Sequence, residues 1–112
     1  MSRYDDMGLR ILAQYERRKT GDTCTESLRV DGQGLIPRAD PKYCVRIMPK
    51  DDPNNHRFPL PADFNVKKYF TIPAKDLPVP IPYDADVTIA IIETDRRGER
   101  VLAQSPLRYS TV

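Results

Sequence analysis

The sequence predicts a mainly β domain, a small α+β fold in which an antiparallel β-sandwich or rolled sheet carries one N-terminal helix. Three observations predict this class. Apolar residues alternate over 87–94 and resume over 100–104 after Asp95-Arg96-Arg97-Gly98, which is the pattern of a β-hairpin. From Thr23 onward, short segments are separated by Pro, Gly, Asn and Asp, as is typical of β proteins. Before Thr23, apolar residues recur at a three-and-four spacing that favours a helix.

The N-terminal segment, residues 1–21, is interpreted as this helix and its cap. Ser2 and Asp5 resemble a capping box, and Gly21 can end the helix. A strand is the competing interpretation, because the odd-numbered residues from Leu9 to Tyr15 are all apolar. Both remain open at this point, and we favour the helix. The residues that would share one helix face are Tyr4, Met7, Gly8, Ile11, Leu12 and Tyr15.

The remaining residues, 22–112, are expected to form the β-rich core. Asp31-Gly32-Gln33-Gly34 is predicted as a turn, because glycine readily adopts the positive φ that turns require, and residues 49–55 are predicted as a polar loop. The expected strands are 27–30, 43–48, 64–72, 87–94, 100–104 and 107–110.

Two of these segments have an unusual composition. Residues 77–82 carry proline at every second position, which predicts an extended rod with Leu77, Val79 and Ile81 on one side. Such a rod can pack on the chain's own sheet or lie along a partner. Residues 87–92 are apolar on both faces, so that strand is expected to be central or covered on each side.

The last hairpin, with its tip at Asp95 to Gly98, resembles the final hairpin of immunoglobulin-like and transthyretin-like β-sandwiches. The resemblance covers this hairpin alone. It implies a β-sandwich fold, and no functional residue is carried over from it.

Length and composition indicate a single domain over 1–112, since one core typically needs about 100–150 residues. No apolar run approaches the roughly 20 residues that span a bilayer, and the first residues lack the apolar stretch of a secretory signal. We therefore expect a chain without a membrane partner, located in the cytoplasm or in a virion.

Residues able to perform chemistry are few. His56 is the only histidine and is expected in the exposed loop, while Cys24 and Cys44 are expected to be reduced thiols, with Cys44 in the core. The carboxylate pairs fit capping and turn roles better than a calcium loop. The sequence therefore predicts no catalytic residues, no cofactor and no metal site.

The favoured function is a non-catalytic structural or protein-interaction subunit of a larger assembly. A virus or phage particle is one expected setting, because small β modules without catalytic groups are common there. Self-association or a protein partner would use apolar side chains of the helix and the rod. The candidate interaction residues are Met7, Ile11, Leu12, Tyr15, Leu77, Val79 and Ile81.

The alternative is a small nucleic-acid-binding β module. The net charge is only +2, but basic residues outnumber acidic ones in the middle third of the chain, and some neighbour aromatic residues. The candidate residues are Arg17, Arg18, Lys19, Lys67, Lys68, Arg96 and Arg97.

Overall fold

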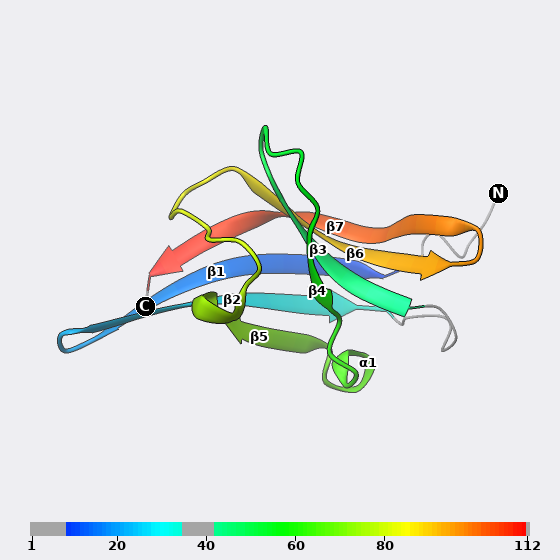
Figure 1. Ribbon diagram of the computed structural model, residues 1–112. Helices are drawn as coiled ribbons and strands as arrows, with labels where there is room; N and C mark the ends of the chain where they lie inside the picture. Colours follow the sequence, from blue (N-terminus) through cyan, green and yellow to red (C-terminus); the bar gives the residue numbers. More distant parts are fainter. Residues whose placement is uncertain (1–8, 35–41, 112) are drawn as a thin grey trace.

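The computed structural model of the protein describes residues 9–34 and 42–111. The described strands form one curled, mixed sheet in the order β4-β3-β6-β7-β1-β2-β5, an open half-barrel (Figure 1). The mainly β class is therefore confirmed. The strands are β1 (Arg10–Thr20), β2 (Thr23–Gln33), β3 (Lys42–Pro49), β4 (His56–Pro59), β5 (Tyr69–Pro73), β6 (Val87–Asp95) and β7 (Gly98–Thr111), with a short helix α1 (Phe64–Lys67) and a 3-10 turn η1 (Ala74–Asp76).

The predicted N-terminal helix is wrong for the residues that the structure describes. Arg10–Thr20 is strand β1, paired antiparallel with β2 along its whole length. The period of two prevails over the three-and-four spacing because it directs Ala13 and Tyr15 together into the core, where both are fully buried. The part of the predicted helix that includes Met7 and the capping box lies outside the described residues.

Strand β7 joins the two halves of the sheet. Residues Gly98 to Pro106 pair antiparallel with β6, and Leu107 to Thr111 pair parallel with β1. The two strands expected over 100–104 and 107–110 are therefore one long strand. Its parallel pairing with β1 makes the sheet mixed rather than purely antiparallel.

The predicted hairpin of β6 and β7 is confirmed. Asp95 pairs with Gly98 across the tip, and Gly98 has a positive φ of 123°. Strand β6 lies between β3 and β7, and even Ala90 and Ile92, which point to the outer face, are buried. The expectation that this strand is central is thus met.

The core fills the concave side of the half-barrel. Three aromatic rings lie near its open side, where Phe70 of β5 contacts both Phe58 of β4 and Phe64 of α1 edge to face. The two edge strands therefore meet through side chains although they do not pair. The buried apolar residues of this core are Leu9, Ala13, Tyr15, Leu28, Val30, Val45, Ile47, Phe64, Phe70, Ile81, Val87, Ile89, Ile91 and Leu107.

The segment around Phe64 departs from two predictions. The strand expected over 64–72 begins as helix α1, which ends at Lys68 in a left-handed conformation before β5 starts. The turn expected at Asp31 to Gly34 is instead the end of β2, which runs to Gln33. Gly32 serves a packing role there, since a Cβ atom on it would lie 2.4 Å from Cζ of Phe64.

The proline rod packs on the chain's own core. Exposure alternates along it, with Leu77 and Val79 partly buried, Ile81 buried and the prolines exposed. It connects η1 to β6 without joining the sheet. In the two described ranges of the chain, no helix has the length and apolarity to cross a bilayer.

Candidate interaction site

The β1–β2 hairpin extends beyond the described strands that flank it. Strand β7 pairs with β1 as far as Arg17, and β5 pairs with β2 only from Ser27 onward. Residues 18–26, here called the arm, therefore form a two-stranded ribbon at one end of a molecule that measures 51 × 30 × 24 Å (Figure 1). The arm turns at Gly21, whose φ is 60°.

The arm has no apolar face. All residues from Arg18 to Thr25 are exposed, and most are charged or are threonine. A two-stranded hairpin in water is marginally stable at best, and its unpaired backbone groups can pair with another strand. The arm therefore has little burial to hold it and offers backbone groups that another chain could pair with.

The root of the arm is firmly fixed. Glu26 accepts a hydrogen bond from the hydroxyl of Tyr15 and one from Nε of Arg17, both at 2.9 Å. The guanidinium of Arg17 also lies 4.0 Å from the ring centre of Tyr83. Burial, and then the hydrogen bond to the Glu26 carboxylate, raise the pKa of Tyr15 well above its ordinary value.

Contacts among Tyr15, Tyr83 and Tyr109 connect the root of the arm to the rest of the protein. The ring of Tyr109 contacts Tyr15 edge to face and also packs against Tyr83. The Tyr109 hydroxyl donates a 2.6 Å hydrogen bond to the carbonyl of Ala85, and the Tyr83 hydroxyl lies 2.9 Å from that of Thr111. The arm thus projects from a rigid base.

A groove of about 630 Å³ runs beside the arm. It is lined by Cys24 to Ser27 of β2 and by Pro73 to Lys75, where β5 ends and η1 begins. The groove follows the part of the β2 edge that no described strand covers. A signal for this hairpin is present in the sequence, because Thr20-Gly21-Asp22-Thr23 can close a two-residue turn, but the helix interpretation obscured it.

Most of the predicted interaction residues serve the chain's own core. Tyr15 and Ile81 are buried, while Ile11, Leu77 and Val79 are partly buried against the core. Leu12 lies on the outer face of the sheet and is 38% exposed. Met7 lies outside the described residues. Whether any of these residues contacts a partner stays a prediction.

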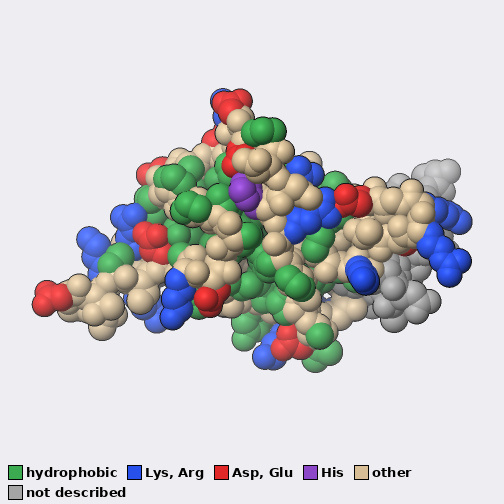
Figure 2. All heavy atoms as spheres, viewed as in Figure 1, with side chains coloured by type: hydrophobic (Ala, Val, Ile, Leu, Met, Phe, Trp, Pro, Cys, Tyr) green, Lys and Arg blue, Asp and Glu red, His purple; other side chains and the backbone are tan. Residues whose placement is uncertain are grey.

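The predicted nucleic-acid residues are not gathered in one place. Arg17 to Lys19 lie at the arm, Lys67 and Lys68 at α1, and Arg96 and Arg97 at the tip of the β6–β7 hairpin, at the opposite end of the molecule (Figure 2). Two of them are already in ion pairs, Arg17 with Glu26 and Lys67 with Asp63.

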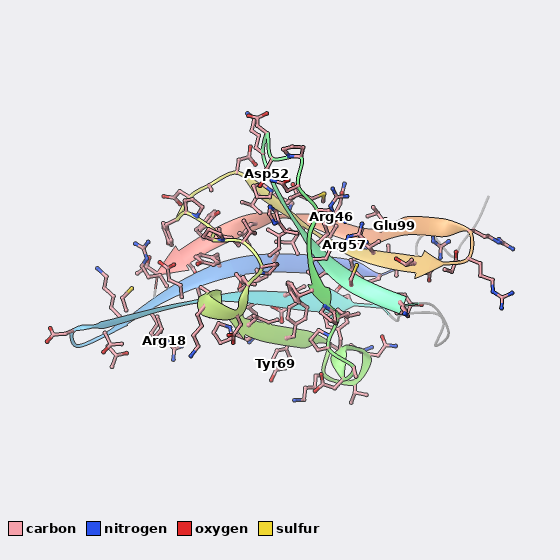
Figure 3. All side chains as sticks on the ribbon, in the orientation of Figure 1. Arg18, Arg46, Asp52, Arg57, Tyr69 and Glu99 are labelled. Atoms are coloured by element: carbon pink, nitrogen blue, oxygen red, sulfur yellow. The ribbon has the colours of Figure 1, made fainter. Side chains whose placement is uncertain are left out.

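The outer face of β1, β2, β5 and β7 carries another basic surface. Arg18 and Tyr69 point to this side (Figure 3), and the strand register places Arg29 and Arg108 on the same face. Arg29 stacks 4.5 Å from the ring centre of Tyr69 and pairs with Asp31 at 3.0 Å. Of these residues, sequence reasoning had singled out Arg18 alone, because the surface is assembled from four strands.

An ion pair crosses the outer face of the other half of the sheet, which β4, β3, β6 and the first part of β7 form. Arg57 of β4 donates to Glu99 of β7 and so spans β3 and β6, which lie between them (Figure 3). Its guanidinium also lies 3.6 Å from Sγ of Cys44, beside a shallow groove of about 540 Å³. The pair shields the outer face of β6, which helps to explain why Ile92 is buried there.

The remaining reactive side chains are separate from one another. Cys24 is exposed and Cys44 half-buried, and both are free thiols. His56 does not stand in an open loop as expected but begins β4, with its Nε2 2.9 Å from Asp52. The backbone N–H of Asn54 and then the imidazole of His56 lower the pKa of Asp52. Within residues 9–34 and 42–111, no group of three His, Cys, Asp or Glu side chains could hold a metal ion.

Comparison with known proteins returned no match from protein-family models, from curated proteins or from solved structures.

Proposed function

We propose that this protein is a structural subunit that assembles with copies of itself through its arm. The observation that carries the proposal is the projecting, polar, two-stranded arm on a fixed root. A ribbon that buries so little of its own surface gains stability when another chain pairs with its backbone or covers it. The setting of such an assembly, including a virus or phage particle, stays a prediction.

The arm suits assembly better than the apolar residues proposed from the sequence. Residues such as Tyr15 and Ile81 would have to leave the core to meet a partner, whereas Arg18 to Thr25 are exposed already. The root of Tyr15, Arg17 and Glu26 holds the arm in one direction, so less ordering entropy is lost on contact.

The test compares the chain with a variant whose arm is shortened. Replacing residues 19–24 by Asn-Gly keeps Arg18 and Thr25 as the closing pair and offers the turn sequence that two-residue hairpins prefer. Light scattering then measures the solution mass of both proteins from about 1 to 500 µM, a range that covers interfaces of weak to standard affinity. We expect the mass of the intact chain to rise with concentration, and that of the shortened variant to stay at the monomer value.

A matched control variant carries the same Asn-Gly turn in the β6–β7 hairpin and leaves both of its strands at full length. Replacing Arg96 and Arg97 by Asn-Gly alters the tip of the other hairpin, at the opposite end of the molecule, and is expected to leave association unchanged. Circular dichroism checks that all variants keep their sheet. An intact chain that stays monomeric throughout, or a shortened variant that associates equally well, would contradict the proposal.

A second candidate is binding of single-stranded nucleic acid by the outer face of β1, β2, β5 and β7. The exposed Tyr69, stacked by Arg29 and accompanied by Arg18 and Arg108 on one face, favours it. Affinity for an oligonucleotide should then fall steeply with salt, and Arg108→Gln should reduce that slope by about one. A salt-independent or undetectable affinity would remove this candidate.

A further inference from the structure

The strand register shows which backbone groups of the arm are open. Thr20 and Thr23 close the two-residue turn, so they form a hydrogen-bonded pair, and such pairs then recur at every second residue. Odd-numbered residues of β2 therefore direct N–H and C=O toward β1, and even-numbered residues direct theirs away. The 2.7 Å hydrogen bond from the Gly32 N–H to the carbonyl of Lys68, on the β5 side, agrees with this pattern.

The unpaired stretch of β2, on its edge away from β1, is short. Leu28 and Val30 use their outward groups on β5, and the pairing of Ser27 with Pro73 brings Ala74 beside Glu26. Cys24 is thus the residue of the arm's β2 strand whose outward N–H and C=O face no described strand or turn. Pro73 ends β5 opposite Ser27, and η1 follows it beside β2, where Ala74 and Lys75 line the same groove as Cys24 to Ser27. An added strand in the line of β5 thus has room for about three residues at the strand rise of about 3.4 Å.

The shape of this gap selects its occupant. A long extended peptide in this line would run into Pro73, whereas a hairpin tip turns back before reaching it. The arm itself is a hairpin whose first strand residue after the turn is Thr23, so a second arm, running antiparallel, brings its tip up to Pro73 and no further.

We propose that two copies of this chain pair their β2 edges antiparallel about a two-fold axis that passes between their Cys24 residues. This rests on the proposed function and names its partner and geometry. Each Cys24 then exchanges both backbone hydrogen bonds with Cys24 of the second copy, and each Thr25 lies opposite Thr23 of the other. A two-fold contact of this kind is self-complementary, because each copy offers the same edge.

Other registers fit less well. Facing side chains must share one side of the sheet, so the pairing can shift only in steps of two residues. A shift that sets Thr25 opposite Thr25 would place Thr23 where Pro73 already lies. The proposed register instead brings the acidic tip residue Asp22 opposite Glu26, whose carboxylate is already paired with Arg17, and into the groove that Lys75 lines with the opposite charge.

Disulfide trapping tests the register directly. Both native cysteines are replaced by serine, and cysteine is then placed at Thr23 in one preparation and at Thr25 in another. Facing residues of a non-hydrogen-bonded pair have Cα atoms about 4.5 Å apart, within the range for a disulfide. We expect the mixed preparations to form a Thr23→Cys to Thr25→Cys cross-link, seen by mass spectrometry, at least about tenfold faster than either preparation alone.

A backbone variant tests the pairing without cross-links. Cys24→Pro removes an N–H that points out of the hairpin, so the ladder between β1 and β2 stays complete, whereas Cys24→Ser keeps that N–H. The dissociation constant, from sedimentation equilibrium, should rise at least about tenfold in the proline variant and stay unchanged in the serine variant.

The outcomes separate this inference from the proposed function. Selective mixed cross-linking together with weakened association of Cys24→Pro supports the two-fold pairing. Cross-linking without preference for the mixed pair, or association that is equal in the proline and serine variants, overturns it. If association still requires the arm in that case, the assembly function stands with another geometry. A chain that never associates overturns both.

Discussion

Gly32 lies beneath the ring of Phe64, and this contact yields a sharp test of the packing. A Cβ atom on Gly32 would lie 2.4 Å from Cζ and 3.0 Å from Cε2 of Phe64, which is 2% exposed and also contacts Phe70. Overpacking of this kind costs about 1–3 kcal/mol, while replacing a strand glycine by alanine recovers about 0.5–1 kcal/mol. Gly32→Ala should therefore lower the free energy of unfolding by about 1–2 kcal/mol.

The same substitution should behave differently when the ring is absent. Phe64→Leu removes the atoms that the new Cβ meets, so in that background Gly32→Ala should be neutral or slightly stabilising. The double-mutant cycle would then give a coupling energy of about 1–3 kcal/mol between the two sites, the full cost of the overpacking. Urea unfolding gives the free energy of unfolding of all four proteins. A change in the midpoint concentration at an unchanged m value shows that stability itself has changed. An equal effect of Gly32→Ala in both backgrounds would refute this account of the glycine.

Two further predictions concern buried polar groups. Because folding raises the pKa of Tyr15 above its ordinary value of 10.0, the folded state holds the phenol proton more tightly, so the free energy of unfolding should fall as pH rises above about 10. Tyr15→Phe should reduce this fall in urea titrations at several pH values, and an unchanged fall would refute the assignment. Glu93 is only 2% exposed and accepts a 2.8 Å hydrogen bond from Arg100. Arg100→Ala should cost about 1.5–3 kcal/mol by thermal or urea unfolding, whereas a loss below about 0.5 kcal/mol would show that the hydrogen bond from the Tyr43 hydroxyl suffices for Glu93.

The β6–β7 hairpin could be predicted because its signals are local. Alternation, a two-residue tip and a glycine at positive φ all lie within one stretch of chain, and each agrees with the others. The burial of one side of the proline rod follows equally from spacing alone. The N-terminal segment was misassigned because Ile11, Leu12 and Tyr15 satisfy a helical spacing while the odd-numbered residues satisfy a strand. Only pairing with β2 decides between the two.

The candidate site could not be predicted because it depends on where strands end relative to one another. Threonine and charged residues around Gly21 would fit any solvated turn. They form an arm because the pairing of β7 with β1 ends at Arg17 and the pairing of β5 with β2 ends at Ser27. The sequence of the arm itself does not indicate where these pairings end. The same holds for the face of Arg29, Tyr69 and Arg108, which the curl of the sheet assembles from distant segments.

The sequence by itself determined the β class, the last hairpin and the apolar side of the rod, since these depend on residues close together in the chain. Tertiary structure alone decided that the first described segment is a strand, that Gly32 makes room for Phe64 and that the arm is left uncovered. Local propensities differ by about 1 kcal/mol or less per residue. Burial of a side chain such as Tyr15 or Phe64 is worth more than that, so long-range packing determines the outcome wherever local signals conflict.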